Sequence, residues 1–409
     1  MTGTIDVGVA RSALQGVMDA DASDSRIVNA YASAVWSTLV EPGDGVAGAL
    51  VGAFGAAGAL DRALSETGRP GVGGIDLTAL DLSGADLEAA RRRWRPRWGT
   101  VGPALDAARR AGVRLLIPDD ADWPRGLDDL GPHAPLCLWI RGTPVPRQQS
   151  AVAIVGARAA TPYGAHVATE IAAECARAGI VVISGAAYGI DAAAHRAALH
   201  VGGSTVAVLA GGVDRPYPAG HDDLITQIAT EGTVVSEVPC GGAPTKWRFL
   251  SRNRLIAALT GATVVVEAAH RSGALNTAHH AASLGRTLGA VPGPVTSAAS
   301  AGCHRLLRET DAVCVTRGAE VLQLLGGVTG GPHPADEVAA DQGRTDDRTR
   351  VLDALSARRA RTVLDIAQRC GMSPEEVAGH LGLLQLDDAV EHRDGGWIRR
   401  QTSTPARLW

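Results

Sequence analysis

Short runs of β-branched residues alternate with longer alanine-rich stretches of helical periodicity from residue 150 to about residue 326. This alternation is typical of βαβ units, in which parallel strands form one sheet and helices cover both of its faces. We therefore predict an α/β domain with a Rossmann-like, doubly wound, mostly parallel sheet. The predicted strands are Val152–Val155, Ile180–Ile183, Thr205–Leu209, Thr233–Val235, Thr263–Val266 and Thr287–Val291.

The two ends of the chain have different patterns. Residues 1–120 place apolar residues at helical spacing, which predicts a helical N-terminal domain of the sterile-α-motif or helix-hairpin-helix kind. Residues 327–350 are rich in glycine, proline and acids, as expected of a flexible linker. Residues 351–400 show three helices and then a hairpin around Asp394-Gly395, which together predict a winged helix. The Rossmann-like domain is expected to span residues 121–326.

Composition limits the classes of function. The net charge is −4, so a polyanion would have to bind at a local basic patch rather than through the charge of the whole chain. The six cysteines are scattered without the spacing of a zinc or redox site, so we expect buried thiols in a reducing cytoplasm, with no metal and no cofactor. We see no secretory signal and no uninterrupted apolar run long enough to span a membrane.

The loop after the first predicted strand resembles an anion-binding turn. Small residues there open a helix, and a helix N-terminus presents backbone N–H groups to an anion. Arg158 adds a positive charge and a fork of hydrogen-bond donors. The glycines at 156 and 164 are too far apart for G-x-G-x-x-G, so a dinucleotide site is weakly supported. The candidate ligand-binding residues of this loop are Arg158, Thr161, Tyr163 and Gly164.

The second predicted strand ends in Ser184 and Gly185, and a helix follows. Ser184 could donate to a phosphate, and Gly185 permits close approach of the backbone. Asp191 and His195 are four residues apart on that helix, so a catalytic pair is conceivable. We favour the alternative that they form a helix cap and an internal hydrogen bond.

The basic segment from Lys246 to Arg254 is the strongest candidate for chemistry. It carries four cations in nine residues, including the only lysine among 39 basic residues. We expect it at a helix N-terminus, where cations oppose the helix dipole unless an anion binds. Trp247 and Phe249 supply flat faces for base stacking, a combination typical of single-strand grooves. The alternative is a solvated basic loop. The candidates are Lys246, Phe249, Arg252, Asn253 and Arg254.

Two further segments need an interpretation. Ser272 is a plausible N-cap of a helix that would point its N–H groups toward the same edge of the sheet. The segment from Arg91 to Trp98 carries five arginines and two tryptophans. It could grip nucleic acid, but we favour a helix C-terminus, where arginine suits the dipole and Pro96 stops the helix.

These motifs, in this order and spacing, resemble the DprA/Smf family of DNA-processing proteins between about residues 115 and 325. The matching stretches include Val155-Gly-Ala-Arg, Thr161-Pro-Tyr-Gly, Ser184-Gly-Ala-Ala-Tyr-Gly-Ile-Asp, Tyr217-Pro218, Ser236-Glu237, Phe249-Leu-Ser-Arg-Asn-Arg, Val266-Glu267 and Val291-Pro-Gly-Pro.

The resemblance implies a cytoplasmic, homodimeric bacterial protein that binds and protects single-stranded DNA and loads the RecA recombinase during natural transformation and recombination. It implies no enzymatic activity. The chain departs from the family at Ala157, where a hydroxyl residue is usual, and at Leu250, where proline is usual. The resemblance assigns the DNA pocket to Arg158, Ser184, Gly185, Phe249, Arg252, Asn253 and Arg254.

Three other functions remain to be weighed. A nucleotide phosphoribohydrolase of the lysine-decarboxylase-like group would need an acid within Ser272–His280, and none occurs there. A dinucleotide-dependent oxidoreductase lacks its fingerprint. A duplex-binding winged helix should have a basic third helix, but Pro374 to Val390 contains four acids and neither lysine nor arginine. We read that module as a surface for a partner or for self-association, or as vestigial.

Overall fold

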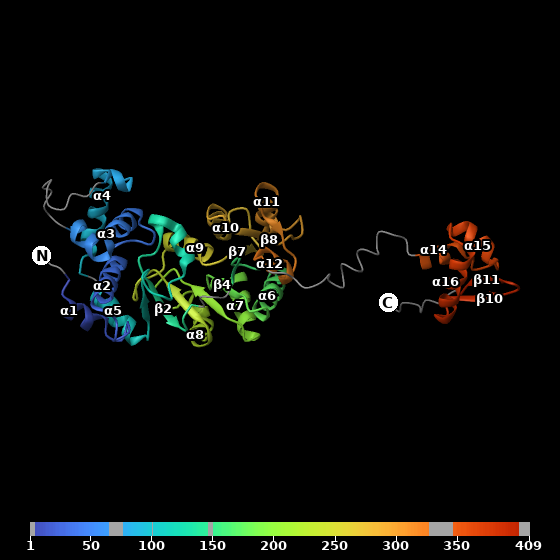
Figure 1. Cartoon of the computed structure of the whole chain (residues 1–409), viewed down its shortest axis with the longest axis horizontal. Helices are drawn as coiled ribbons and strands as arrows, with labels where there is room; N and C mark the ends of the chain where they lie inside the picture. The colour runs from blue at the N-terminus through green and yellow to red at the C-terminus, as the bar shows by residue number, and fades with distance from the viewer. Residues whose placement is uncertain (1–4, 65–76, 100, 146–149, 327–346, 401–409) are drawn as a thin grey trace. The chain divides into compact units, whose positions relative to one another are not determined.

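The computed structural model describes residues 5–64, 77–99, 101–145, 150–326 and 347–400 (Figure 1). The chain divides into two compact units, residues 1–329 and residues 330–409, and each is described by itself.

Unit 1 is built on one large sheet, for which nine strands are found among the described residues. Their order is β1-β2-β6-β5-β4-β3-β7-β8-β9. Neighbouring strands from β6 to β9 pair in parallel, and β2 joins β6 antiparallel with β1 outside it. The strands are β1 (Arg114–Leu116), β2 (Leu138–Gly142), β3 (Ala151–Val155), β4 (Val181–Ser184), β5 (Thr205–Val208), β6 (Thr233–Ser236), β7 (Ala262–Val265), β8 (Thr287–Ala290) and β9 (Val313–Cys314).

The predicted fold class is confirmed. The six predicted strands correspond to β3 through β8, and the sequence pattern missed the short strands β1, β2 and β9 at the two edges. The strand order reverses at the neighbouring pair β3 and β7, because β4 to β6 follow on one side and β8 and β9 on the other. Loops that leave the carboxyl ends of two such strands diverge, and ligands of open α/β sheets bind in the crevice between them.

Alternation along the strands explains the apolar runs. Val152 and Ile154 of β3 pack with helices on one face, and Ala153 and Val155 pack on the other. A strand buried on both faces needs apolar residues at nearly every position. Helices α6 (Pro162–Arg177), α7 (Ile190–His200) and α12 (Gly318–Leu324) cover the first face. Helices α9 (Lys246–Ala258), α10 (Gly273–Ser283) and α11 (Ala301–Glu309) cover the second.

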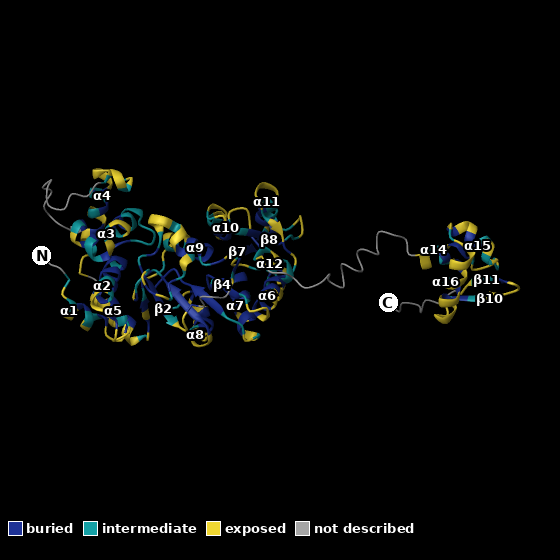
Figure 2. Cartoon of the chain, viewed as in Figure 1, coloured by how far each residue is buried: buried dark blue, intermediate teal, exposed yellow. Residues whose placement is uncertain are grey.

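The N-terminal helices belong to the same compact unit as the sheet (Figure 2). Their core includes Trp36 and Trp94 and continues into α8 (Asp222–Glu231) and into Val234 of β6. Because this core is shared between the N-terminal helices and the sheet domain, the domain boundary predicted at residue 120 remains a prediction. These helices are α1 (Val7–Leu14), α2 (Asp24–Leu39), α3 (Gly45–Leu64), α4 (Gly84–Trp94) and α5 (Val101–Arg110).

Helix α3 is, among the described residues, the one helix long and apolar enough to be a candidate membrane span. Gly55 interrupts it with a φ of 69°, outside the helical range. The indole N–H of Trp36 donates to the carbonyl of Ala56 just beyond this break, over 3.0 Å. Each half is shorter than the ~20 residues that a span requires.

Unit 2 is a winged helix, as predicted. It contains α14 (Asp347–Ala354), α15 (Val363–Cys370), α16 (Pro374–Leu386), β10 (Val390–Arg393) and β11 (Gly396–Arg399). Ser373 and Glu376 form a capping box at the start of α16, and Pro374 occupies its first turn. Helix α14 begins at Asp347, inside the segment predicted as linker, because its first four residues are polar and the apolar pattern that begins at Val351 does not mark its start. Residues 327–346 of that predicted linker lie outside the described residues.

Candidate nucleic-acid interface

A pocket of about 300 Å³ opens at the point where the strand order reverses. The loops after β3 and β4 form one side, α9 forms another, and the N-terminus of α10 completes it. The sequence-predicted site residues that line the pocket are Arg158, Phe249, Arg252, Asn253 and Ser272.

Two guanidinium groups lie around the Phe249 ring. The Arg158 carbon Cζ is 4.9 Å from the ring centroid, and that of Arg252 is 6.0 Å from it. Arg158 is exposed and makes no ion pair within the described residues, so its charge is available to a ligand. A cation over an aromatic face stabilises that ring orientation. The arrangement presents one flat apolar surface flanked by positive charge.

Arg252 forms the floor of the pocket. Its side chain is buried and donates to the carbonyl oxygens of Gly185, over 2.8 Å, and of Val208. Burial, opposed by the charge of Asp191 and aided by that of Arg158, lowers the pKa of Arg252 to about 10. Arg252 therefore stays protonated at neutral pH. Gly185 leaves room for the Arg252 guanidinium, since an added Cβ would lie 2.2 Å from the Arg252 Nη1 atom.

Asp191 and His195 do not act as a pair. The Asp191 carboxylate accepts from the backbone N–H groups of Gly185 and Ala187, at 3.1 and 3.4 Å. Burial raises the pKa of Asp191, and the charge of Arg252 opposes that rise. His195 instead hydrogen-bonds the Thr205 hydroxyl over 2.7 Å, and burial lowers its pKa to about 3. Both side chains thus make hydrogen bonds inside the protein, as the structural interpretation expected, but Asp191 does not cap α7, whose N-cap is Gly189.

Asn253 and Ser272 shape the opening between α9 and α10. The Asn253 amide donates to the carbonyl oxygen of Gly273 over 3.3 Å and to the side-chain oxygen of Asn276 over 3.2 Å. Ser272 caps α10, as predicted, by accepting from the N–H of Ala274. Ser272, Gly273 and Ala274 at the start of α10 line the pocket, and a helix N-terminus favours an anion.

The N-terminus of α6 is already filled by a carboxylate. Buried Glu267 accepts from the Thr161 N–H over 2.9 Å and from its hydroxyl over 2.6 Å. Gly164 leaves room for it, since an added Cβ would lie 2.3 Å from the carboxylate. Tyr163 donates its hydroxyl to the carbonyl of Pro292. Thr161, Tyr163 and Gly164 thus lie outside the pocket, which corrects the prediction of an open anion site. The sequence analysis did not identify Glu267 as the residue that occupies this helix N-terminus.

Two more of the predicted DNA-binding residues make their hydrogen bonds inside the protein. Ser184 is fully buried and donates to the carbonyl of Ile154 over 2.6 Å, so it cannot reach a phosphate. Arg254 is buried and makes two bonds to the carboxylate of Glu237, at 2.9 and 2.7 Å. Neither side chain lines the pocket.

Helix α9 begins earlier than the sequence suggested. Thr245 is its N-cap and Lys246 its first residue, so Arg252 and Arg254 lie in the middle of the helix rather than at its N-terminus. The argument that these two arginines oppose the helix dipole is therefore wrong. Lys246 and Trp247 are exposed in the first turn, outside the pocket lining.

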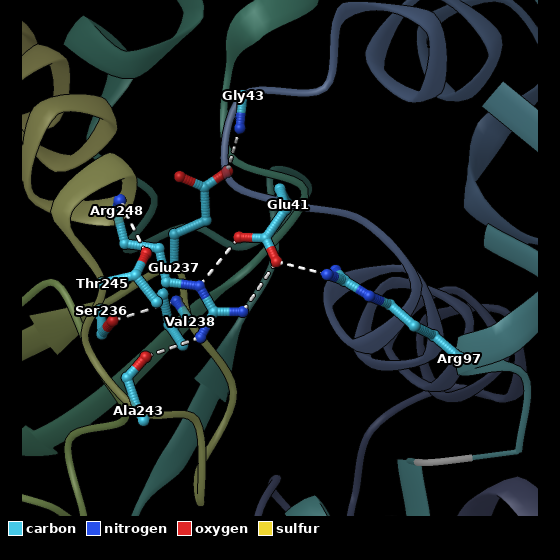
Figure 3. A network of polar contacts seen from close by, with 9 residues as sticks. All are labelled: Glu41, Gly43, Arg97, Ser236, Glu237, Val238, Ala243, Thr245 and Arg248. Carbon is cyan, nitrogen blue, oxygen red and sulfur yellow. Dashed lines mark hydrogen bonds and ion pairs between the residues drawn. The ribbon is translucent and has the colours of Figure 1, made fainter. Parts of the chain in front are cut away.

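Arg248, the second of the four cations of this segment, forms an ion pair with Glu41 in the loop between α2 and α3 (Figure 3). It donates twice to the carboxylate of Glu41, at 2.8 and 2.9 Å, and Arg97 donates to the same carboxylate over 2.6 Å. Burial opposes ionisation of Glu41, but the two arginines hold its pKa below the ordinary value. Acids distant in sequence thus pair cations that looked unpaired in the sequence.

A second contact joins the loop of residues 41–44, which carries Glu41, to α9. The Gly43 N–H donates over 3.1 Å to the Glu237 carboxylate, which in turn holds Arg254. Gly43 has a φ of 78°, and an added Cβ would lie 3.2 Å from the Arg254 guanidinium. We call the loop of residues 41–44, with these two contacts, the α9 clamp.

The Arg91–Trp98 segment contains the C-terminus of α4, in agreement with the structural interpretation, and Trp94 is its buried residue, whereas Arg92, Arg93, Arg95 and Trp98 are exposed. Trp94 is buried against Trp36 and donates to Asp44. Arg91 donates to the carbonyls of Arg62 and Ala63 near the end of α3.

Metal ligands and reactive thiols are not gathered in the part of the chain that the structure describes. No group of three or more His, Cys, Asp or Glu side chains could hold a metal there. Burial raises the pKa of four cysteine thiols to about 12: Cys137, Cys175, Cys240 and Cys303.

Comparison with known proteins is specific. A family model described as DNA recombination-mediator protein A matches residues 114–326, and a DprA winged helix domain model matches residues 332–396. A Mycobacterium tuberculosis protein provisionally named DNA processing protein DprA is 47% identical, covering 72% of this chain and 78% of the relative. Protein Smf of Escherichia coli is 30% identical, covering 81% of this chain and 90% of the relative. The X-ray structure of DprA from Streptococcus pneumoniae gives a TM-score of 0.57 at 29% identity, covering 72% of this chain and 97% of that chain.

Proposed function

Because this chain belongs to the DNA recombination-mediator protein A (DprA/Smf) family, we propose that it binds single-stranded DNA in the pocket between β3, α9 and α10. The observation that carries the proposal is the Phe249 ring flanked by the guanidinium groups of Arg158 and Arg252. An unstacked base can lie on the ring, and the cations can contact the phosphates beside it. Duplex bases are already stacked and do not offer this face.

The wider role that we propose follows from the family. The chain protects incoming single strands in the cytoplasm and loads RecA on them, as a homodimer, in transformation or recombination. The names of the relatives support DNA processing, and the RecA and dimer parts rest on the family resemblance alone. The pocket acts by binding rather than by catalysis, since Asp191, the acid that lines it, is committed to backbone N–H groups.

The proposal is tested by fluorescence anisotropy with a labelled oligonucleotide, its duplex and a salt series. We expect preference for the single strand, with log K falling by about 0.7 per log unit of salt for each phosphate contact. Equal binding of the duplex would refute the proposal.

Variants identify the binding site. Phe249→Ala should cost roughly 1–3 kcal/mol of binding free energy through lost stacking. Arg158→Ala should weaken binding to all sequences and reduce the salt slope by about 0.7. The matched control is Arg110→Ala, because Arg110 is also exposed but lies on α5. If Phe249→Ala and Arg158→Ala both bind like the unmodified chain, the pocket is not the DNA site. A nucleotide hydrolysis assay on the same samples tests the phosphoribohydrolase alternative.

A further inference from the structure

A row of aromatic rings continues outward from the pocket. The Tyr217 ring lies 5.5 Å from Phe249, centroid to centroid, and is tilted by 55° to it. Tyr217 does not line the pocket, and 47% of its surface is exposed. It follows β5, so it stands at the same carboxyl edge of the sheet as Arg158. Its exposed ring is therefore the next flat surface beyond Phe249.

A third aromatic residue, Tyr188, lies beside the segment that follows Tyr217. It lies in the loop after β4 and is 47% exposed, and its ring meets His221 edge-on at 4.5 Å. An added Cβ on Gly220 would lie 2.7 Å from the Tyr188 hydroxyl oxygen, so the tyrosine rests on the segment that follows Tyr217. The His221 ring is itself fixed by a 3.0 Å hydrogen bond with the carbonyl of Ala186. The Tyr188 ring thus has a defined place before any ligand arrives.

A free cation accompanies the two rings. Arg215 is exposed, two residues before Tyr217, and makes no ion pair within the described ranges. Its neighbour Asp214 forms no ion pair with it in the described part of the chain, and both Asp214 oxygens accept from the Gly241 N–H, at 2.8 and 3.0 Å. An exposed cation beside two exposed aromatic faces is the combination that binds single strands without reading their sequence.

We propose that Tyr217, Tyr188 and Arg215 form a second binding strip for single-stranded DNA, outside the pocket. Each tyrosine stacks one base, and Arg215 contacts the phosphate backbone between them. The strand leaves the pocket across Phe249 and passes to Tyr217 and then to Tyr188. This inference rests on the proposed function, since the strip continues the pocket.

The strip makes a prediction about oligonucleotide length. Affinity of the full chain for oligothymidylates is measured from about 4 to about 16 nucleotides, the usual range of single-strand sites. Tyr217→Leu, Tyr188→Leu and Arg215→Ala should bind the shortest oligonucleotide as the unmodified chain does. On the longer ones, each tyrosine variant should lose about 5- to 150-fold in affinity, and Arg215→Ala should lower the salt slope by about 0.7. Tyr217→Phe and Tyr188→Phe keep the rings and should restore the affinity.

Controls separate the strip from the pocket. Trp98→Leu removes a ring that is 55% exposed elsewhere in unit 1 and should change no affinity. Phe249→Ala should weaken binding at every length, and failure of that result would count against the pocket itself. If Phe249→Ala behaves as expected but the strip variants bind every length normally, the strip is refuted and the pocket stands. Equal loss at all lengths in the tyrosine variants would also overturn the strip, since it would mean that the rings only support Phe249.

Discussion

The floor of the pocket depends on the absence of a side chain at Gly185. Gly185 has no side chain at a point where the Arg252 guanidinium packs directly against its backbone. The position does not need a glycine for its backbone angles, because φ is not in the left-handed region. The constraint is therefore steric.

At the residue scale, we predict that Gly185→Ala both destabilises the chain and weakens DNA binding. The added Cβ would displace Arg252 and leave buried carbonyl groups without a donor, for a loss of about 1–3 kcal/mol in the free energy of unfolding. Denaturant titration and anisotropy measure the two effects. Gly102→Ala is the control, because a Cβ there meets nothing within 4 Å. Unchanged stability and affinity in Gly185→Ala would contradict the assigned role of Arg252.

Sequence reasoning succeeded at residues whose role depends on local chemistry. Ser272 as an N-cap and Phe249 as an accessible ring both follow from type and spacing. It failed for Arg254, whose partner Glu237 lies 17 residues away and meets it only after β6 and α9 pack together. Tyr188 and Tyr217 could have been found, since they are two of four tyrosines and both follow predicted strands.

At the scale of elements, α9 is held by the N-terminal helices through the α9 clamp. Its first turn carries the exposed residues Lys246 and Trp247, and this turn is fixed by the Thr245 N-cap and by the α9 clamp. The boundaries of α9 could not be read from the sequence, because Thr245 is a weak signal within a run of cations.

We predict that Glu41→Gln loosens the start of α9. Removing the charge should lower the free energy of unfolding by roughly 1 kcal/mol, a value reduced because Glu41 is partly exposed to solvent. Amide hydrogen exchange should rise in residues 246–249. Glu88→Gln is the control, since Glu88 pairs with Arg91 and Arg92 only at 4.0 and 3.9 Å. Unchanged exchange in α9 would show that the clamp does not fix this turn.

The same pair gives a pH dependence. The pKa of Glu41 is lowered in the folded chain, so its contribution to stability is present above the ordinary value of 4.5 and is lost as pH falls through the lowered pKa. The difference in stability between the unmodified chain and Glu41→Gln should therefore shrink below pH 4.5. Chemical denaturation at several acidic pH values measures it, and a difference that grows on acidification would contradict the ion pair.

At the scale of the whole molecule, the DNA pocket lies entirely within unit 1. The helix α16 of unit 2 carries Glu375 and Glu376 in its first turn, which suits the helix dipole but not a phosphate backbone. The order of the segments along the chain was predictable from periodicity. How far the N-terminal helices merge with the sheet was not, because shared cores depend on contacts between distant residues.

We predict that residues 1–329 alone bind single-stranded DNA within about twofold of the full chain. Anisotropy at one salt concentration measures both, and residues 330–409 serve as the control that should not bind. A loss of tenfold or more, about 1.4 kcal/mol, would mean that unit 2 takes part in binding.

The position of Glu267 affects how free nucleotides could compete with DNA for this protein. Its carboxylate occupies the helix N-terminus where nucleotide-binding sheets of this type usually receive a diphosphate. The abundant soluble nucleotides of a cell therefore cannot place a diphosphate at the N-terminus of α6. Occupation of this helix N-terminus by Glu267 would favour recognition of single-stranded DNA over the large excess of free nucleotides.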